Sequence, residues 1–129
     1  MGQEEQINYW ISSAQEDWGV VHDLYKSGRY MYALFFVHLT IEKILKGHWI
    51  KTNNEIPPRT HDLIYLHDQT ELNLESNDLE LLESMNSWNL EGRYPDYKKS
   101  RYKVATAEFT KLKIERIEIL RKWLLEKLQ

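Results

Sequence analysis

The chain has 129 residues, which is enough for one domain with a single core and too few for two catalytic domains. Hydrophobic residues make up 42% and charged residues 29%, a balance typical of globular proteins. The absence of cysteine excludes disulfides, thiolate zinc sites and cysteine nucleophiles. The formal net charge of -3 gives no strong overall field that would attract nucleic acid.

The sequence contains no pattern typical of a membrane or secreted protein. No apolar run approaches the roughly 18 residues of a membrane span. The first residues, Met1–Asn8, are polar and acidic, unlike a signal peptide. We therefore expect a cytoplasmic protein.

Two long helices are predicted first. Between Glu4 and Ser27, apolar residues recur at steps of three and four, which defines one helical face. Gly28 suits the end of this helix because glycine accepts a positive φ. From Tyr30 to about Thr52 the apolar stripe is broader, which predicts a central helix buried on several sides.

A short helix and a longer one are predicted next. Thr60 can serve as the N-cap of a short helix from His61 to about Gln69. Asp62 would then lie in the first turn, where a negative charge favours the helix dipole. A further amphipathic stretch predicts a helix from Asp78 to about Leu90.

The chain ends with a predicted loop, Gly92–Ser100, and a last long helix from about Val104 to Leu128. The expected buried seam of that helix contains Phe109, Leu112, Arg116 or Ile117, Leu120, Trp123 or Leu124, and Leu128, with Ile114 and Ile119 on its flanks. No stretch alternates convincingly as a strand would. The expected fold is therefore all-α, with four long helices and one short helix in an antiparallel up-and-down bundle forming one domain over residues 1–129.

A polar strip is predicted on the second helix. Glu42 and Lys46 are four residues apart and share one face with His38, and Lys43 stands beside them. The functional interpretation is a strip facing a groove, with Lys46 available to hold a phosphate. Spacing alone favours a solvent-side Glu42–Lys46 pair worth about 0.2–0.5 kcal/mol.

The segment from Arg59 to His61 places cationic side chains at a predicted helix start. A helix N-terminus with nearby Arg and His side chains can receive an anion. The alternative is that Thr60 only caps the helix and His61 only packs. The residues leave these two interpretations about equal.

The charged residues divide into two stretches. Between Arg59 and Arg93 there are eight acidic residues and no Lys or Arg. From Gly92 to Lys103, five basic residues alternate with three tyrosines, among them Tyr94 and Tyr97. Basic groups neutralise phosphates and tyrosine rings stack on bases. The alternative is a solvated loop whose tyrosines cover the end of the bundle.

No motif indicates a metal or cofactor. The histidines lack the spacing of an HExxH site, and no P-loop, dinucleotide fingerprint or GxSxG motif occurs. We expect no cofactor and no metal ligands.

Three blocks together resemble one family. They are the run from Tyr30 through Val37, His38, Ile41, Glu42 and Lys43 to Lys46, the run Pro58-Arg59-Thr60-His61-Asp62-Leu63, and the run Arg93-Tyr94-Pro95-Asp96. Their order and spacing resemble those of small prokaryotic HEPN proteins carrying an RYPD motif.

The resemblance implies a bundle of four or five helices that commonly dimerises and that is associated with nucleotide binding. Many prokaryotic members act with a nucleotidyltransferase, often as toxin and antitoxin. Many toxin members are metal-independent ribonucleases marked by an Arg, four to six residues, and a His. In this sequence no His follows an Arg at that spacing, so the ribonuclease role is not carried over.

The leading hypothesis is a non-catalytic module that binds a nucleotide or RNA phosphate, as a homodimer and with a nucleotidyltransferase partner. The expected binding residues are Glu42, Lys43, Lys46, Arg59, His61, Arg93, Tyr94, Asp96 and Tyr97. One alternative is a divergent ribonuclease that uses His61 and Arg93. Another is a protein-interaction bundle whose acidic stretch faces a basic partner.

Overall fold

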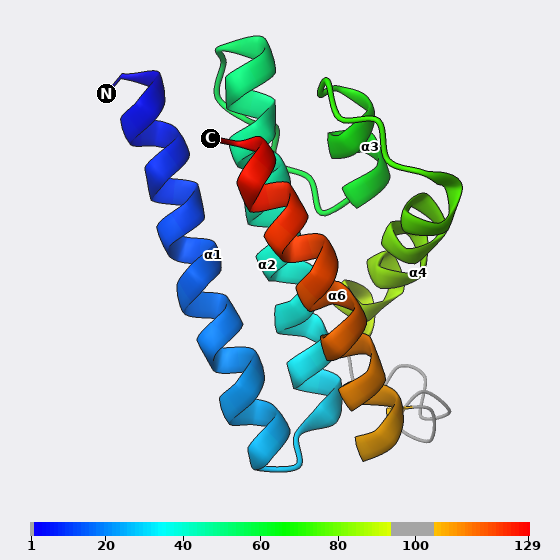
Figure 1. The fold of residues 1–129 in the computed structure, drawn as a ribbon. Helices are drawn as coiled ribbons and strands as arrows, with labels where there is room; N and C mark the ends of the chain where they lie inside the picture. Colours follow the sequence, from blue (N-terminus) through cyan, green and yellow to red (C-terminus); the bar gives the residue numbers. More distant parts are fainter. Residues whose placement is uncertain (1, 94–104) are drawn as a thin grey trace.

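The computed structural model describes residues 2–93 and 105–129. These residues form four long helices, one short helix and no strand, which confirms the predicted all-α class (Figure 1). None of the described helices is long and apolar enough to cross a lipid bilayer.

Helices α1 (Gln3–Lys26) and α2 (Tyr30–Asn53) form an antiparallel hairpin (Figure 1). The Arg29 N–H closes the turn with a 2.9 Å hydrogen bond to the carbonyl of Leu24. Gly28 has a φ of 78°, in the left-handed region that glycine enters without steric cost. Helix α1 ends at Lys26 with Ser27 as its C-cap, so the predicted cap Gly28 lies one residue later, where it turns the chain toward α2.

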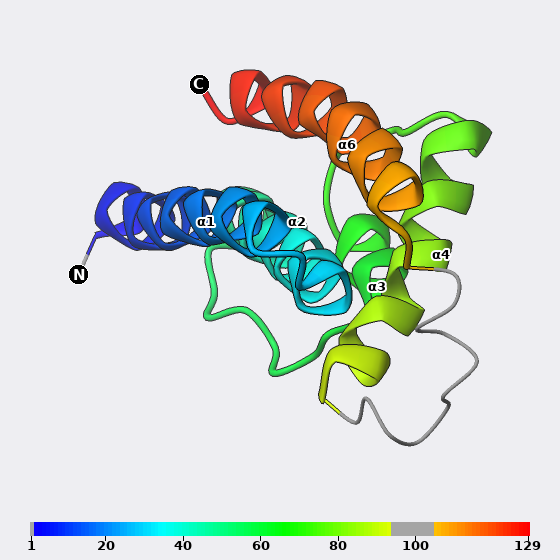
Figure 2. The same ribbon diagram turned by 90° about the horizontal axis from the view of Figure 1, so that it is seen from below.

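Helix α2 lies at the centre of the fold and packs against each of the other described helices. Its side chains Val37, Ile41, Ile44 and Leu45 are completely buried. Figure 2 shows α3 and α4 on the opposite side of α2 from α1. Polar side chains on α2 can therefore be buried against α1 on one side or against α3 and α4 on the other. The predicted polar strip of α2 does not have to face solvent.

Helix α3 (Leu63–Asp68) begins later than predicted, and its N-cap is Asp62 rather than Thr60. The Asp62 carboxylate accepts hydrogen bonds from the backbone N–H groups of Ile64 and Tyr65. Thr60 instead accepts a 3.1 Å bond from the Asp62 N–H. Both residues are good capping types two positions apart, and tertiary contacts select the second one.

Helix α4 (Ser76–Arg93) ends three residues later than the predicted Leu90. Gly92 was expected to open a loop, but it lies within the helix. A single glycine costs about 1 kcal/mol in a helix and does not by itself end one. Arg93 is consequently in the last turn of α4.

Helix α6 (Ala107–Lys127) begins after Thr106, whose side chain accepts a 3.1 Å bond from the Phe109 N–H. It runs in the same direction as α2 (Figure 1). The buried row contains Ile117, Leu120 and Leu124 of the predicted seam, together with Ile114, which was expected on its flank. The seam was wrong for Leu112 and Trp123. Leu112 and Trp123 lie on the outer side of that row and are 59% and 36% exposed.

Candidate functional site

A chain of polar contacts joins α2, the segment before α3, and the end of α4. In order of contact, it contains Lys46, Glu42, His61 and Arg93. The first two residues are on α2, His61 is in the connecting segment, and Arg93 is on α4. We call these four residues the His61 site.

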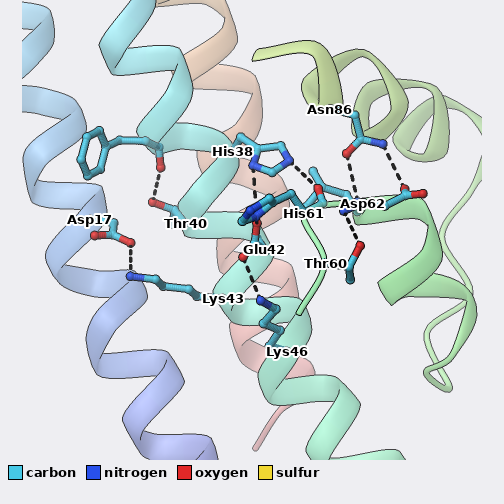
Figure 3. Close-up of polar contacts among 12 residues, drawn as sticks. Asp17, His38, Thr40, Glu42, Lys43, Lys46, Thr60, His61, Asp62 and Asn86 are labelled. Atoms are coloured by element: carbon cyan, nitrogen blue, oxygen red, sulfur yellow. Dashed lines mark hydrogen bonds and ion pairs between the residues drawn. The ribbon is translucent and has the colours of Figure 1, made fainter. Parts of the chain in front are cut away.

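Glu42 is the most deeply buried of the four side chains, only 3% exposed. Its Oε2 atom lies 3.0 Å from Lys46 Nζ, and its Oε1 atom lies 2.8 Å from His61 Nδ1 (Figure 3). A buried carboxylate is tolerated only when other groups compensate its lost hydration. Lys46 and His61 provide that compensation from two sides.

Lys46 is buried as well, and its ammonium group is engaged on the protein. Besides the bond to Glu42, its Nζ atom lies 5.2 Å from the centre of the Trp10 ring. The interpretation of Glu42–Lys46 as a solvent-side pair was therefore wrong. Glu42 and Lys46 do pair along one face of α2, as their spacing of four predicted. That face is covered by α1 and by the segment before α3.

His61 is held in one tautomer. Arg93 Nη2 lies 2.6 Å from His61 Nε2, and a guanidinium group only donates hydrogen bonds. Nε2 must therefore accept, and Nδ1 carries the proton that is donated to Glu42. The result is a neutral imidazole ordered by a buried carboxylate on one side and a guanidinium on the other.

The outer half of the site is open. The His61 side chain is 46% exposed and Arg93 is an exposed residue. Their polar atoms belong to residues 32 positions apart in sequence, and helical packing brings them together. A molecule approaching this surface meets an imidazole and a guanidinium side by side.

His38 supports the site from below. It is completely buried, and its Nε2 atom lies 2.9 Å from the carbonyl oxygen of His61, so Nε2–H donates to it. Its other ring nitrogen, Nδ1, lies 3.9 Å from Glu42 Oε1. Burial lowers the pKa of His38 below its usual value, against the opposing effect of the Glu42 carboxylate. His38 is therefore neutral near pH 7.

Asn86 on α4 fixes the same segment from the opposite direction. Its amide Nδ2 donates a 3.1 Å bond to Asp62, and its Oδ1 atom accepts a 3.0 Å bond from the Leu63 N–H (Figure 3). Asn86 was not among the site residues predicted from the sequence. Its spacing of seven residues from Arg93 could have identified it, because two residues at that spacing share one face of a helix. This requires the helix to continue through Gly92.

Two predicted site residues lie apart from this chain of contacts. Lys43 points toward α1, where its Nζ atom is 2.7 Å from Asp17 Oδ2 (Figure 3). The same Nζ atom donates a 2.7 Å hydrogen bond to Ser13 Oγ. Arg59 is exposed, and no ion pair of its side chain is found within residues 2–93 and 105–129. Tyr94, Asp96 and Tyr97 were also predicted to bind ligand, and they lie outside the described residues.

The fold places this protein in the class of all-α helical bundles. The family model of the HEPN domain matches residues 7–128. The chain therefore belongs to the HEPN domain family, as the three sequence blocks predicted.

A solved structure shows the same fold. The crystal structure of an archaeal HEPN homologue matches with a TM-score of 0.73 and 21% sequence identity. The match covers 96% of this chain and 98% of that one. No curated protein matches the chain.

Proposed function

We propose that this protein binds the phosphate of a nucleotide or of RNA at the His61 site, without catalysis. The observation that carries the proposal is the exposed Arg93 guanidinium beside the ordered imidazole of His61. Membership in a nucleotide- and RNA-related family agrees with this chemistry.

The guanidinium of Arg93 has donors to spare. Arginine carries five N–H donors, and the contact with His61 uses Nη2. The remaining donors form the planar fork that suits a phosphate group. Arg59, two residues before His61 and exposed, would add a second cation to the same anion.

The roles of the two lysines differ from the sequence-based hypothesis. Because Lys46 neutralises buried Glu42, we assign it to positioning the site instead of holding phosphate. Lys43, paired with Asp17, braces α1 against α2. Tyr94, Asp96 and Tyr97 remain proposed binding residues on the sequence pattern alone, with the two tyrosine rings stacking on bases.

Partners are proposed on the family resemblance. They are a second copy of the chain and a nucleotidyltransferase, in an arrangement like that of a toxin and its antitoxin. Sedimentation of the purified chain tests the homodimer. Co-elution with the nucleotidyltransferase of a neighbouring gene tests the pair.

The binding proposal is tested by titrating a fluorescein-labelled single-stranded RNA and, separately, ATP. Loss of one arginine–phosphate contact in Arg93→Ala is expected to weaken binding roughly tenfold. The matched control is Arg29→Ala, which removes an exposed arginine at the N-cap of α2, outside the His61 site, and is expected to bind as wild type does. Equal binding by wild type and Arg93→Ala would exclude the proposed site.

A metal-independent ribonuclease is the second candidate, and the Glu42–His61 hydrogen bond favours it. After Arg93 turns toward the substrate, His61 Nε2 would take the proton of a ribose 2′-hydroxyl, whose oxygen attacks the adjacent phosphorus. The bond from that phosphorus to the 5′-oxygen of the next nucleotide would break, leaving a 2′,3′-cyclic phosphate, and the imidazolium would return its proton to the leaving oxygen. Glu42 would stabilise the imidazolium formed, and Arg93 the charge on the phosphate oxygens.

RNA cleavage separates the two candidates. The ribonuclease predicts that wild type cleaves RNA in EDTA and that His61→Ala loses roughly 10²–10⁴-fold in rate while still binding RNA. Absence of cleavage by wild type, with binding retained, supports the non-catalytic module.

A further inference from the structure

A groove lies on the other side of the molecule from α1, between the start of α4 and the outer face of α6. It has a volume of about 410 Å³. Of the elements that carry the His61 site, α4 also lines this groove. Its apolar lining comes from Leu74, Ile119, Leu120 and Trp123.

The outer face of α6 continues the apolar lining along the helix. Leu112, Ile119 and Trp123 are 59%, 67% and 36% exposed, at spacings of seven and four. This spacing places them on one stripe, about 16 Å long at the rise of an α-helix. Large apolar side chains gathered beside a groove mark an interaction surface.

The length of the stripe fits about three turns of an amphipathic helix. Such a helix presents apolar residues at the same spacing and buries them in a groove of this kind. The stripe therefore indicates the shape of the occupant.

The charge around the groove indicates the occupant's polar face. The wall at the start of α4 contributes Glu75 and Asp78. Asp78 pairs with Arg116 across the groove, whereas Glu75 is exposed and has no ion pair within the described ranges 2–93 and 105–129. Arg116, the cation of α6 that lines the groove, is the partner of Asp78. Of the lysines further along α6, Lys122 pairs with Glu118 and Lys127 lies over the Trp123 ring.

The same wall belongs to the stretch between Arg59 and Arg93 that has acidic residues and no Lys or Arg. A two-fold pairing of this face with a second copy would place that acidic wall in both halves of one interface. A partner with lysines or arginines beside its apolar row meets the wall favourably instead.

We propose that the groove between α4 and α6 is a docking site for a basic amphipathic helix of a partner protein. The apolar residues of that helix pack on Leu74, Ile119 and Trp123, and a basic residue faces Glu75. This interaction surface is separate from the His61 site and does not depend on nucleotide or RNA binding.

The test uses three 18-residue peptides and fluorescence anisotropy at physiological salt. One peptide is an amphipathic helix of leucine and lysine, the second replaces each lysine by glutamate, and the third scrambles the first. The lysine helix is expected to bind at least tenfold more tightly than the other two. Equal binding of the lysine and glutamate helices overturns the proposal.

Three variants of the full chain locate the binding. Ile119→Asn is expected to weaken the lysine helix about tenfold, as loss of a central anchor does. Glu75→Gln is expected to weaken it about threefold, in the range of a rim charge. Ile56→Asn, at a residue that is 85% exposed and outside the groove, is the matched control and is expected to bind as wild type does.

Two results contradict the assignment. If Ile119→Asn binds the lysine helix as tightly as Ile56→Asn does, the peptide is not in the groove. If wild type sediments as a dimer that Ile119→Asn dissociates, the occupant is a second copy of the chain.

Discussion

The backbone carbonyl of His61 accepts a 2.9 Å hydrogen bond from the buried ring of His38. One turn further along α2, Glu42 accepts a 2.8 Å bond from the ring of the same His61. Helix α2 therefore fixes both the main chain and the side chain of His61, although that residue lies outside any helix. This double support explains how a half-exposed imidazole keeps one orientation.

Replacing His38 by Ala is expected to lower the free energy of unfolding by about 2–4 kcal/mol. The change leaves a cavity where a completely buried ring was and removes the donor to the His61 carbonyl. It is also expected to weaken RNA binding at the His61 site. Urea unfolding and the RNA titration measure the two effects. Exposed His22→Ala is the control, and a loss as small as that control's would contradict the supporting role.

Stability is expected to fall as the pH drops below 6.5. Burial lowers the pKa of both His38 and His48 in the folded chain, His48 being bonded to the Leu124 carbonyl. The unfolded chain then takes up protons first, so each histidine costs at most about 1.4 kcal/mol per pH unit below that point. Urea unfolding at pH 7.5 and 5.5 measures the effect.

The variant that tests the pH dependence is His48→Gln, which keeps a donor for Leu124 but does not titrate. Its loss of stability between pH 7.5 and 5.5 should be smaller than that of wild type. His22→Gln, at an exposed position, serves as the control. An identical pH dependence in wild type and His48→Gln would show that His48 is not a source of it.

The sequence predicted the helices better than the contacts between them. Periodic apolar residues located α1 and α2, and Gly28 located the turn, because these features are set by local geometry. The end of α4 was missed at Gly92, since one unfavourable residue is outweighed by packing of the preceding turns. That error placed Arg93 in a loop and concealed its alignment with Asn86.

The candidate site was predicted as a set of residues but not as an arrangement. Glu42, His61 and Arg93 were selected from three separate blocks, and the structure brings them together. The spacing of four predicts that Glu42 and Lys46 pair, but it does not show whether the pair is buried. Burial depends on which elements cover that face of α2. The Lys43–Asp17 pair, between α1 and α2, was invisible for the same reason.

Removing one partner of the buried Glu42–Lys46 pair is expected to be costly. Glu42→Gln leaves the Lys46 ammonium buried without its counter-charge, and the expected loss is about 3 kcal/mol in the free energy of unfolding. The double variant Glu42→Gln/Lys46→Met removes the stranded charge and should recover much of that loss. Urea unfolding of both proteins measures this coupling. A double variant less stable than Glu42→Gln would contradict the assignment of Lys46 as the counter-charge.

The N-cap of α3 offers a direct comparison between two neighbouring residues. Asp62→Ala removes the acceptor of the Ile64 and Tyr65 N–H groups and the contact with Asn86, so it should cost about 1–2 kcal/mol. Thr60→Ala removes one exposed bond to the Asp62 N–H and should cost less than about 0.5 kcal/mol. Thermal and urea unfolding rank the two variants. The opposite ranking would contradict the assignment of Asp62 as the N-cap of α3.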